Sequence, residues 1–234
     1  MERKEFVLSS VRLLAVSLLE FSFSPLDGKN IKFEPGQFVM LHQLENGSFG
    51  KLSRAFSIAS SPLNPELRFV IKITGGAFTS ILSKMKPGDR VGVSGPFGNF
   101  AFRGEERIVC IAAGTGVAPM VGILEYVSQK KLDGKFTLFY SAKTESLVAC
   151  RGLLDSFQAS NPGIKVVYSL TRETPSGWKH ELGRIDSKMM GKYADYAKDA
   201  TVFICGPAEF SKAMKGIMLG LGTSEVRIKA EAWG

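Results

Sequence analysis

The chain has 234 residues, a formal net charge of +8 and a hydrophobic fraction of 44%. This length suits two domains, and the composition excludes a disordered or fibrous protein. The three cysteines form no Cys-x-x-Cys pair, which argues against a disulfide framework or an iron–sulfur cluster and favours a reducing, cytoplasmic compartment. The basic residues are scattered, so they argue against a nucleic acid ligand and leave two interpretations, a solvated surface or a docking face for an acidic partner.

Residues 1–103 carry mostly strand patterns. Residues 67–73 alternate in the manner of a strand, and Pro-Gly turns at 35–36 and 87–88 each precede another apolar run. Short strands separated by such turns are typical of an antiparallel barrel. We therefore predict an N-terminal antiparallel β-barrel domain over residues 1–103.

The stretch 108–124, between Arg107 and Glu125, contains no charged residue. A helix that spans a bilayer needs roughly 20 apolar residues, and this stretch is marginal in length and carries Gly114, Gly116 and Pro119 at its middle. It divides better into a buried strand, a tight glycine turn and a helix. Such a turn directs backbone N–H groups toward an anion, and we predict no membrane span.

Residues 104–234 alternate strands with helical patterns, which predicts a parallel α/β nucleotide-binding domain. A ligand of such a sheet lies outside the carboxyl ends of its strands, where turns carrying Gly114, Thr171 and Cys205 emerge. The candidate strands are 108–113, 136–140, 164–170, 201–205 and 226–230. One expected helix contains Leu147, Leu154 and Phe157, and another contains Phe210, Ala213, Met214, Ile217 and Leu221.

Five stretches occur in an order that resembles the ferredoxin–NADP reductase family of flavoproteins. They are "RAFS" at 54–57, "GGAFTSIL" at 75–82, "GTGVAP" at 114–119, "CGP" at 205–207 and the terminal "EAWG". The resemblance covers nearly the whole chain. It implies a Greek-key barrel that binds FAD, followed by a domain that binds NADP(H), and hydride transfer between these two cofactors. It implies no metal site.

The resemblance assigns contacts with the flavin cofactor to Arg54, Phe56 and Ser57 of the stretch "RAFS". Arg54 would hold the flavin diphosphate, and Ser57 would approach flavin N5, the atom that accepts hydride. Phe56 replaces the usual tyrosine of the family, so its ring can still pack on the flavin although the hydroxyl contact is lost. Gly75 and Gly76 would let the backbone approach a phosphate, and Thr79 and Ser80 would lie at a helix start with free N–H groups.

The nicotinamide nucleotide is assigned to loops of the second domain. By resemblance, the loop Gly114, Thr115 and Gly116 would face the diphosphate and nicotinamide. Thr171 and Arg172 would grip the 2′-phosphate of NADP, so NADP is favoured, with NAD as the alternative.

The last two motifs would lie at the reacting atoms. Cys205, followed by Gly206 and Pro207, would lie near nicotinamide C4 and position it without a thiolate. Glu231 and Trp233 match the family's Glu-x-aromatic ending, and Trp233 would cover the flavin face on which nicotinamide stacks. The expected catalytic set is Ser57, Cys205, Glu231 and Trp233.

The positive charge suits an acidic electron carrier, a ferredoxin or flavodoxin, as the partner. Two alternatives in the same class are the reductase component of a multi-component oxygenase and a reductase of free flavin or ferric chelates. An alternative of another class is a non-catalytic flavin-binding electron-transfer subunit. The acceptor, the direction of electron flow and the oligomeric state stay open at this point.

Overall fold

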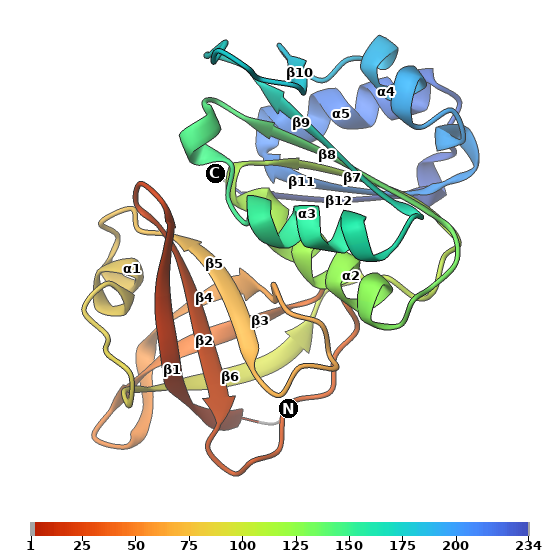
Figure 1. Cartoon of the computed structure of the whole chain (residues 1–234). Helices are drawn as coiled ribbons and strands as arrows, with labels where there is room; N and C mark the ends of the chain where they lie inside the picture. Colours follow the sequence, from red (N-terminus) through yellow and green to blue (C-terminus); the bar gives the residue numbers. More distant parts are fainter. Residues whose placement is uncertain (1–2, 234) are drawn as a thin grey trace.

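A computed structural model describes residues 3–233, with the side chain of Trp233 outside that description. Figure 1 shows a curled antiparallel sheet at the bottom and a layered α/β unit above it. The first sheet is built from β1 (Arg3–Ala15), β2 (Leu18–Pro25), β3 (Phe38–Glu45), β4 (Ser48–Ser57), β5 (Leu67–Lys72) and β6 (Arg90–Phe97).

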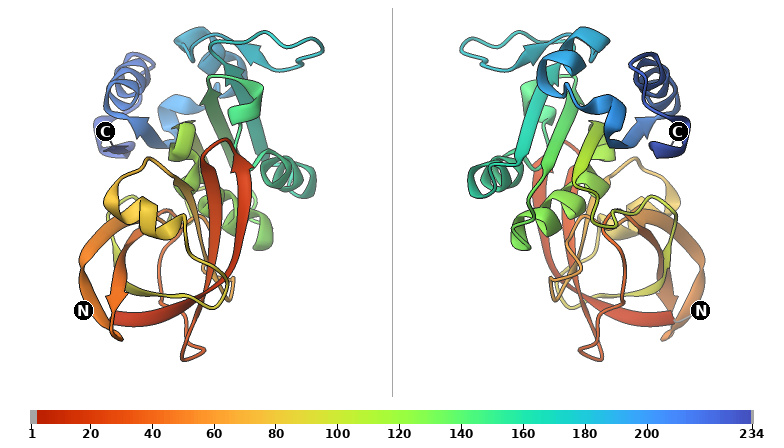
Figure 2. Two further views of the ribbon diagram at one scale, coloured as in Figure 1. Left: turned by 90° about the vertical axis from the view of Figure 1, so that its left-hand side faces the viewer. Right: turned by 90° about the vertical axis from the view of Figure 1, so that its right-hand side faces the viewer.

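The strand order of this sheet is β4-β3-β6-β1-β2-β5, and every pairing is antiparallel. The last strand, β6, is inserted between β3 and β1, so the chain crosses over in the Greek-key manner. The sheet curves into a barrel whose two edge strands, β4 and β5, are not hydrogen-bonded to each other within residues 3–233; Figure 2 shows the curvature from two sides. The predicted antiparallel barrel is confirmed.

The alternation in residues 67–73 explains how β5 is placed. Leu67, Phe69 and Ile71 point into the barrel core and are at most 2% exposed, whereas Val70 packs on the other face against the second domain. A short helix, α1 (Ala77–Leu82), covers one end of the barrel and buries Phe78 in the same core.

The second sheet contains the five strands that the sequence predicts and a short strand, β10, that it does not, in the order β10-β9-β8-β7-β11-β12, all parallel. Its central strand is β7, so the order of the strands reverses beside it, and the crevice for a ligand is expected there. The strands are β7 (Arg107–Ala113), β8 (Lys135–Ala142), β9 (Ile164–Leu170), β10 (Glu181–Leu182), β11 (Thr201–Pro207) and β12 (Ile228–Trp233).

Helices cover both faces of this sheet because successive apolar residues of its strands point to opposite sides. In β7, Cys110 packs toward α2 (Val117–Gln129) and α3 (Arg151–Ser160), and Ile111 packs toward α4 (Ser187–Tyr193) and α5 (Ala208–Gly220). Figure 1 shows α2 and α3 on the side of the sheet nearer the barrel.

The limits of two predicted elements differ most from the structure. The last strand, predicted over 226–230, begins at Ile228, because a 3-10 turn (Glu225–Arg227) precedes it and leaves Val226 89% exposed. Leu147 belongs to a separate 3-10 turn (Glu145–Leu147), and α3 starts only at Arg151, after Cys150 adopts a left-handed conformation with φ of 57°.

The uncharged stretch 108–124 forms β7, a 3-10 turn (Gly114–Gly116) and the first part of α2. Across residues 3–233, no helix combines the length and the apolar character needed to cross a bilayer. The division between residues 103 and 104 falls in the connection from β6 to β7 and stays a prediction.

Candidate functional site

A cavity of about 900 Å³ lies where the two edge strands of the barrel meet the nucleotide domain. Its walls come from β3, β4, β5, the start of α1, the turn before α2, the first turn of α2 and the end of β12. Seven of the residues that the sequence singles out line it: Arg54, Phe56, Ser57, Gly76, Thr79, Thr115 and Glu231. Segments far apart in the chain therefore converge on one space.

The motif at 54–57 lies at the end of β4, where its pairing with β3 fixes it. Arg54 is opposite Leu41, and Ser57 is opposite Phe38. Arg54 is exposed, so its guanidinium is available at the rim of the cavity. The ring of Phe56 lies 6.0 Å from the ring of Phe78, which also lines the cavity. A cation and an aromatic wall are thus held on one side of the space.

The glycine pair at 75–76 makes the turn that leads into α1. Gly75 has φ of 76°, a conformation that favours glycine, and Gly76 is the N-cap. The Thr79 hydroxyl donates to the Gly76 carbonyl at 3.1 Å, so it closes the first turn of the helix. Gly76 and Thr79 line the cavity, whereas Gly75 and Ser80 flank it without lining it.

The turn Gly114–Gly116 forms the opposite wall. Thr115 lines the cavity, and the Tyr140 hydroxyl on β8 donates to the Gly114 carbonyl at 3.2 Å. A Cβ placed on Gly116 would lie only 2.0 Å from the carbonyl oxygen of Cys205. Only glycine permits this approach, so the turn is locked against β11.

Thr171 and Arg172 lie at the same edge of the sheet but outside the cavity. The amide of Thr171 donates to Ala142 at 3.0 Å, and the amide of Arg172 donates to Lys143 at 2.9 Å. The side chains of Arg172 and Lys143 are exposed. The neighbouring Glu173 carboxylate accepts the amide of Glu145 at 2.7 Å. Two cationic side chains at this edge of the sheet are therefore accessible to an anion.

Cys205 and Glu231 are register partners on adjacent strands β11 and β12. Cys205 is fully buried and does not line the cavity, and burial together with the Glu231 carboxylate raises the pKa of its thiol. A thiolate is therefore disfavoured. Glu231 lines the cavity, and burial raises the pKa of its carboxyl to about 7. Gly206 and Pro207 follow Cys205 on β11 and lie outside the cavity, as does Gly114.

Glu231 gives a testable pH dependence of stability. Its carboxyl has a pKa of about 7 in the folded protein against an ordinary value of 4.5, so the folded state holds the proton more tightly than the unfolded chain. As the pH rises from 4.5 to 7, only the unfolded chain loses this proton, and we expect the free energy of unfolding to fall relative to the Glu231→Gln variant. Denaturant titrations of both proteins across this range measure the difference. A difference that stays constant with pH would contradict the assignment.

Trp233 is the last residue of β12 and pairs with Pro207 through its backbone. The expected placement of its ring over the flavin lies outside the described residues.

The cavity lining also includes residues to which the sequence assigns no role. Lys72 and Thr74 stand at the end of β5 and after it, and Ala118 belongs to the first turn of α2. In the sequence, Lys72 is only the polar member of an alternating strand, and the only signal for it is its position at the end of that strand. The others are Phe38, Met40, Leu52, Ser53, Ala55, Val70, Ile71, Ala77, Phe78 and Ala232.

The donor set of the cavity fits FAD. Aromatic and aliphatic side chains suit a flat ring system, the guanidinium of Arg54 suits a diphosphate, and the glycine turn at 75–76 allows close backbone approach. The cavity volume is that of a site for a large cofactor.

Two family models match consecutive parts of the chain. Residues 5–102 match the oxidoreductase FAD-binding domain, and residues 110–216 match the oxidoreductase NAD-binding domain. The first match lies on the barrel and the second on the α/β unit.

Individual relatives agree with this division. Reductase component 1 of terephthalate 1,2-dioxygenase from Comamonas sp is 26% identical over 83% of this chain and 57% of its own length. NADH-cytochrome b5 reductase 2 from Mycosarcoma maydis is 31% identical over 63% of this chain and 43% of its own length, so the chain spans about half of these relatives. The crystal structure of the flavohem-like FAD/NAD-binding domain of nitric oxide dioxygenase from Vibrio cholerae O1 biovar El Tor superposes with a TM-score of 0.88, at 23% identity, over 99% of this chain and 98% of that one.

A barrel with a flavin-sized cavity, a parallel sheet with a glycine turn beside it, and two adjoining family matches lead to one conclusion. The chain belongs to the ferredoxin–NADP reductase-like family of oxidoreductases, which bind FAD and NAD(P).

Proposed function

We propose that the protein exchanges hydride between NADP(H) and FAD, and exchanges electrons with an acidic ferredoxin or flavodoxin. The observation that carries the proposal is the shared cavity. Ser57 lines it from the barrel, and Thr115 and Glu231 line it from the nucleotide domain. FAD, when bound, supplies the ability to take up a hydride and release electrons singly.

The residues of the chain divide the work of binding and orientation. Arg54 would neutralise the diphosphate of the flavin cofactor, and the hydroxyl of Ser57 would orient the ring through a hydrogen bond. Glu231 stores or releases a proton at its carboxyl, because its pKa of about 7 is close to neutral pH. Cys205 acts through its backbone, which seats the turn at Gly116.

Arg172 and Lys143 support NADP over NAD in this proposal. Both side chains are exposed at the carboxyl edge of the sheet, where the far end of an extended dinucleotide would reach. Glu173, the acidic residue next to Arg172 in the chain, is engaged with the Glu145 amide. The 2′-phosphate of NADP would therefore meet two cations at the carboxyl edge of the sheet.

The test is anaerobic reduction of the bound flavin by each nucleotide. We expect NADPH to bleach the yellow protein, and we expect Arg172→Ala to raise the NADPH concentration for half-maximal reduction about tenfold, since a charge-assisted hydrogen bond is lost. The response to NADH should not change. Bleaching by NADH but not by NADPH would refute the assigned nucleotide, and bleaching by neither would refute hydride exchange.

A second candidate is the reductase component of a multi-component oxygenase. It is favoured by the likeness to the terephthalate dioxygenase reductase, of which this chain covers 57%. The two candidates differ only in the protein that receives the electrons. Reduction of an acidic ferredoxin or flavodoxin that weakens as salt rises supports the first.

A further inference from the structure

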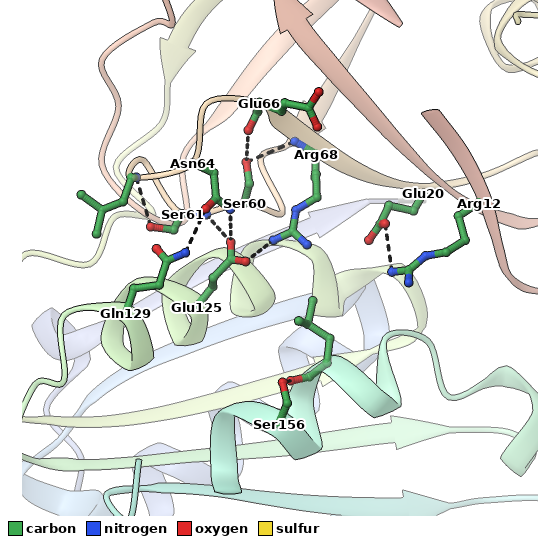
Figure 3. A network of polar contacts seen from close by, with 12 residues as sticks. Arg12, Glu20, Ser60, Ser61, Asn64, Glu66, Arg68, Glu125, Gln129 and Ser156 are labelled. Carbon is green, nitrogen blue, oxygen red and sulfur yellow. Dashed lines mark hydrogen bonds and ion pairs between the residues drawn. The ribbon is translucent and has the colours of Figure 1, made fainter. Parts of the chain in front are cut away.

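One buried carboxylate joins the two domains. Glu125 lies on α2, in the nucleotide domain, yet each of its polar partners belongs to the barrel domain. The amide of Ser61 and the side-chain amide of Asn64 each donate to Glu125 Oε2 at 2.7 Å, and the guanidinium of Arg68 donates to Oε1. Glu125 is only 7% exposed. Figure 3 shows these groups converging on the helix.

The partners belong to one loop, residues 58–66, and to the strand that follows it. The Ser60 hydroxyl accepts the amide of Arg68 at 3.1 Å, which holds the ends of the loop together. Asn64 also accepts from the Gln129 side chain on the same helix at 2.9 Å. The loop therefore has a fixed shape, and α2 grips it at two points.

The helix backbone also touches this loop directly. A Cβ on Gly122 would lie 2.9 Å from the carbonyl oxygen of Ile58 and 3.0 Å from that of Ser60. A larger side chain at this position would push α2 away from the barrel. Gly122 and Glu125 are neighbours on one face of the helix, so close packing and the polar network act at the same place.

The loop and the helix each lead directly to a wall of the cavity. The loop continues from Ser57 at the end of β4, and after Arg68 the chain enters the part of β5 that lines the cavity. The first turn of α2 follows Thr115 on the opposite wall. A tilt of α2 on the loop would therefore move the nucleotide wall relative to the flavin wall.

We propose that Glu125 is a positioning residue that clamps the nucleotide domain onto the barrel and so keeps the two halves of the cavity aligned for hydride transfer. The reaction it serves is the proposed function, whereas the clamp itself is a property of the chain. A buried carboxylate with three donors costs much to break, since removing it leaves the Arg68 guanidinium and the Ser61 amide without their acceptor. Small errors in alignment lower the rate of transfer steeply.

The test compares Glu125→Gln with Glu225→Gln. Glu225 pairs with Lys215 far from the barrel, and its side chain is 71% exposed, so the control removes the same charge without touching the clamp. In Glu125→Gln we expect the rate of flavin reduction at saturating nucleotide to fall about tenfold or more, with nearly unchanged affinity for FAD and nucleotide. The long-wavelength absorbance of stacked nicotinamide and flavin should weaken. Reduction by dithionite, which needs no alignment, should stay as in the wild type.

A second readout needs no cofactor. Hydrogen exchange of the protein without FAD should show lost protection at the Ser61 amide and its neighbours in Glu125→Gln and no change in Glu225→Gln. Asn64→Ala removes the side-chain bonds to Glu125 and Gln129 but keeps the Arg68 and Ser61 bonds to Glu125. It should show the same effects in weaker form, and it replaces Glu125→Gln if that variant does not fold.

The outcomes separate the clamp from the proposed function. Wild-type exchange at Ser61, or lost protection with a wild-type reduction rate, would overturn the positioning role. If neither nucleotide reduces the wild-type protein, the proposed function and the positioning role both fail, while exchange at Ser61 still decides whether Glu125 clamps the domains.

Discussion

Replacing Arg54 with leucine is expected to give a protein that no longer retains FAD. Arg54 lines the cavity, and its exposed guanidinium can donate paired hydrogen bonds to a diphosphate. Hydrogen bonds to charged groups contribute about 1.5–3 kcal/mol each, so losing one or two should weaken FAD binding by roughly ten-fold to twenty-thousand-fold. The measurement is fluorescence titration of the flavin-free protein with FAD.

Two variants make this result specific. Arg54→Lys keeps the charge but loses the planar fork, and we expect an intermediate affinity. Lys51→Leu removes a cation from the same strand, at a position that does not line the cavity, and it should bind FAD as the wild type does. Equal affinity of Arg54→Leu and wild type would exclude a diphosphate contact at this arginine.

Alanine at Gly116 is expected to abolish nucleotide binding and to destabilise the second domain. Its Cβ would lie 2.0 Å from the Cys205 carbonyl oxygen and 2.5 Å from the carbonyl carbon, and these are backbone atoms of a central strand that cannot turn away. Either the turn or the end of β11 must move. Overpacking of this kind costs about 1–3 kcal/mol or more. The expected result is a lower midpoint in thermal unfolding and loss of NADP(H) binding by calorimetry.

Gly152→Ala is the matched control for this substitution. Gly152 lies inside α3, and a Cβ there would meet no atom within 4 Å. Alanine favours a helix over glycine, so this variant should unfold at the same or a higher temperature. Nucleotide binding by Gly116→Ala at wild-type affinity would mean that the turn at 114–116 does not form the nucleotide wall.

Strand and helix patterning was sufficient to predict the two domains, and the motifs identified seven of the residues that line the cavity. Arg54, Ser57 and Thr115 lie in turns or at strand ends, where a few residue types meet a strict backbone requirement, and such places leave a mark in a single sequence. The parallel sheet was equally visible, because strands buried on both faces become continuous apolar runs such as 108–113.

The clamp left no comparable mark. In the sequence, Glu125 is only the charged residue that ends an apolar run, and Arg68 is only a polar member of an alternating strand. Their contact joins positions that are far apart along the chain, and no periodicity connects them. The predicted start of the last strand was wrong for a related reason. Val226 has the side chain of a strand residue but lies in an exposed 3-10 turn.

The cavity opens on the two strands of the barrel, β4 and β5, that have no hydrogen-bonded neighbour on one side within residues 3–233. Bare strand edges recruit strands from other molecules and so promote aggregation. A cofactor bound in this cavity would cover these edges and prevent such pairing. The same cavity therefore links flavin loading to colloidal stability, and we expect the protein to aggregate less when FAD is supplied during expression and storage.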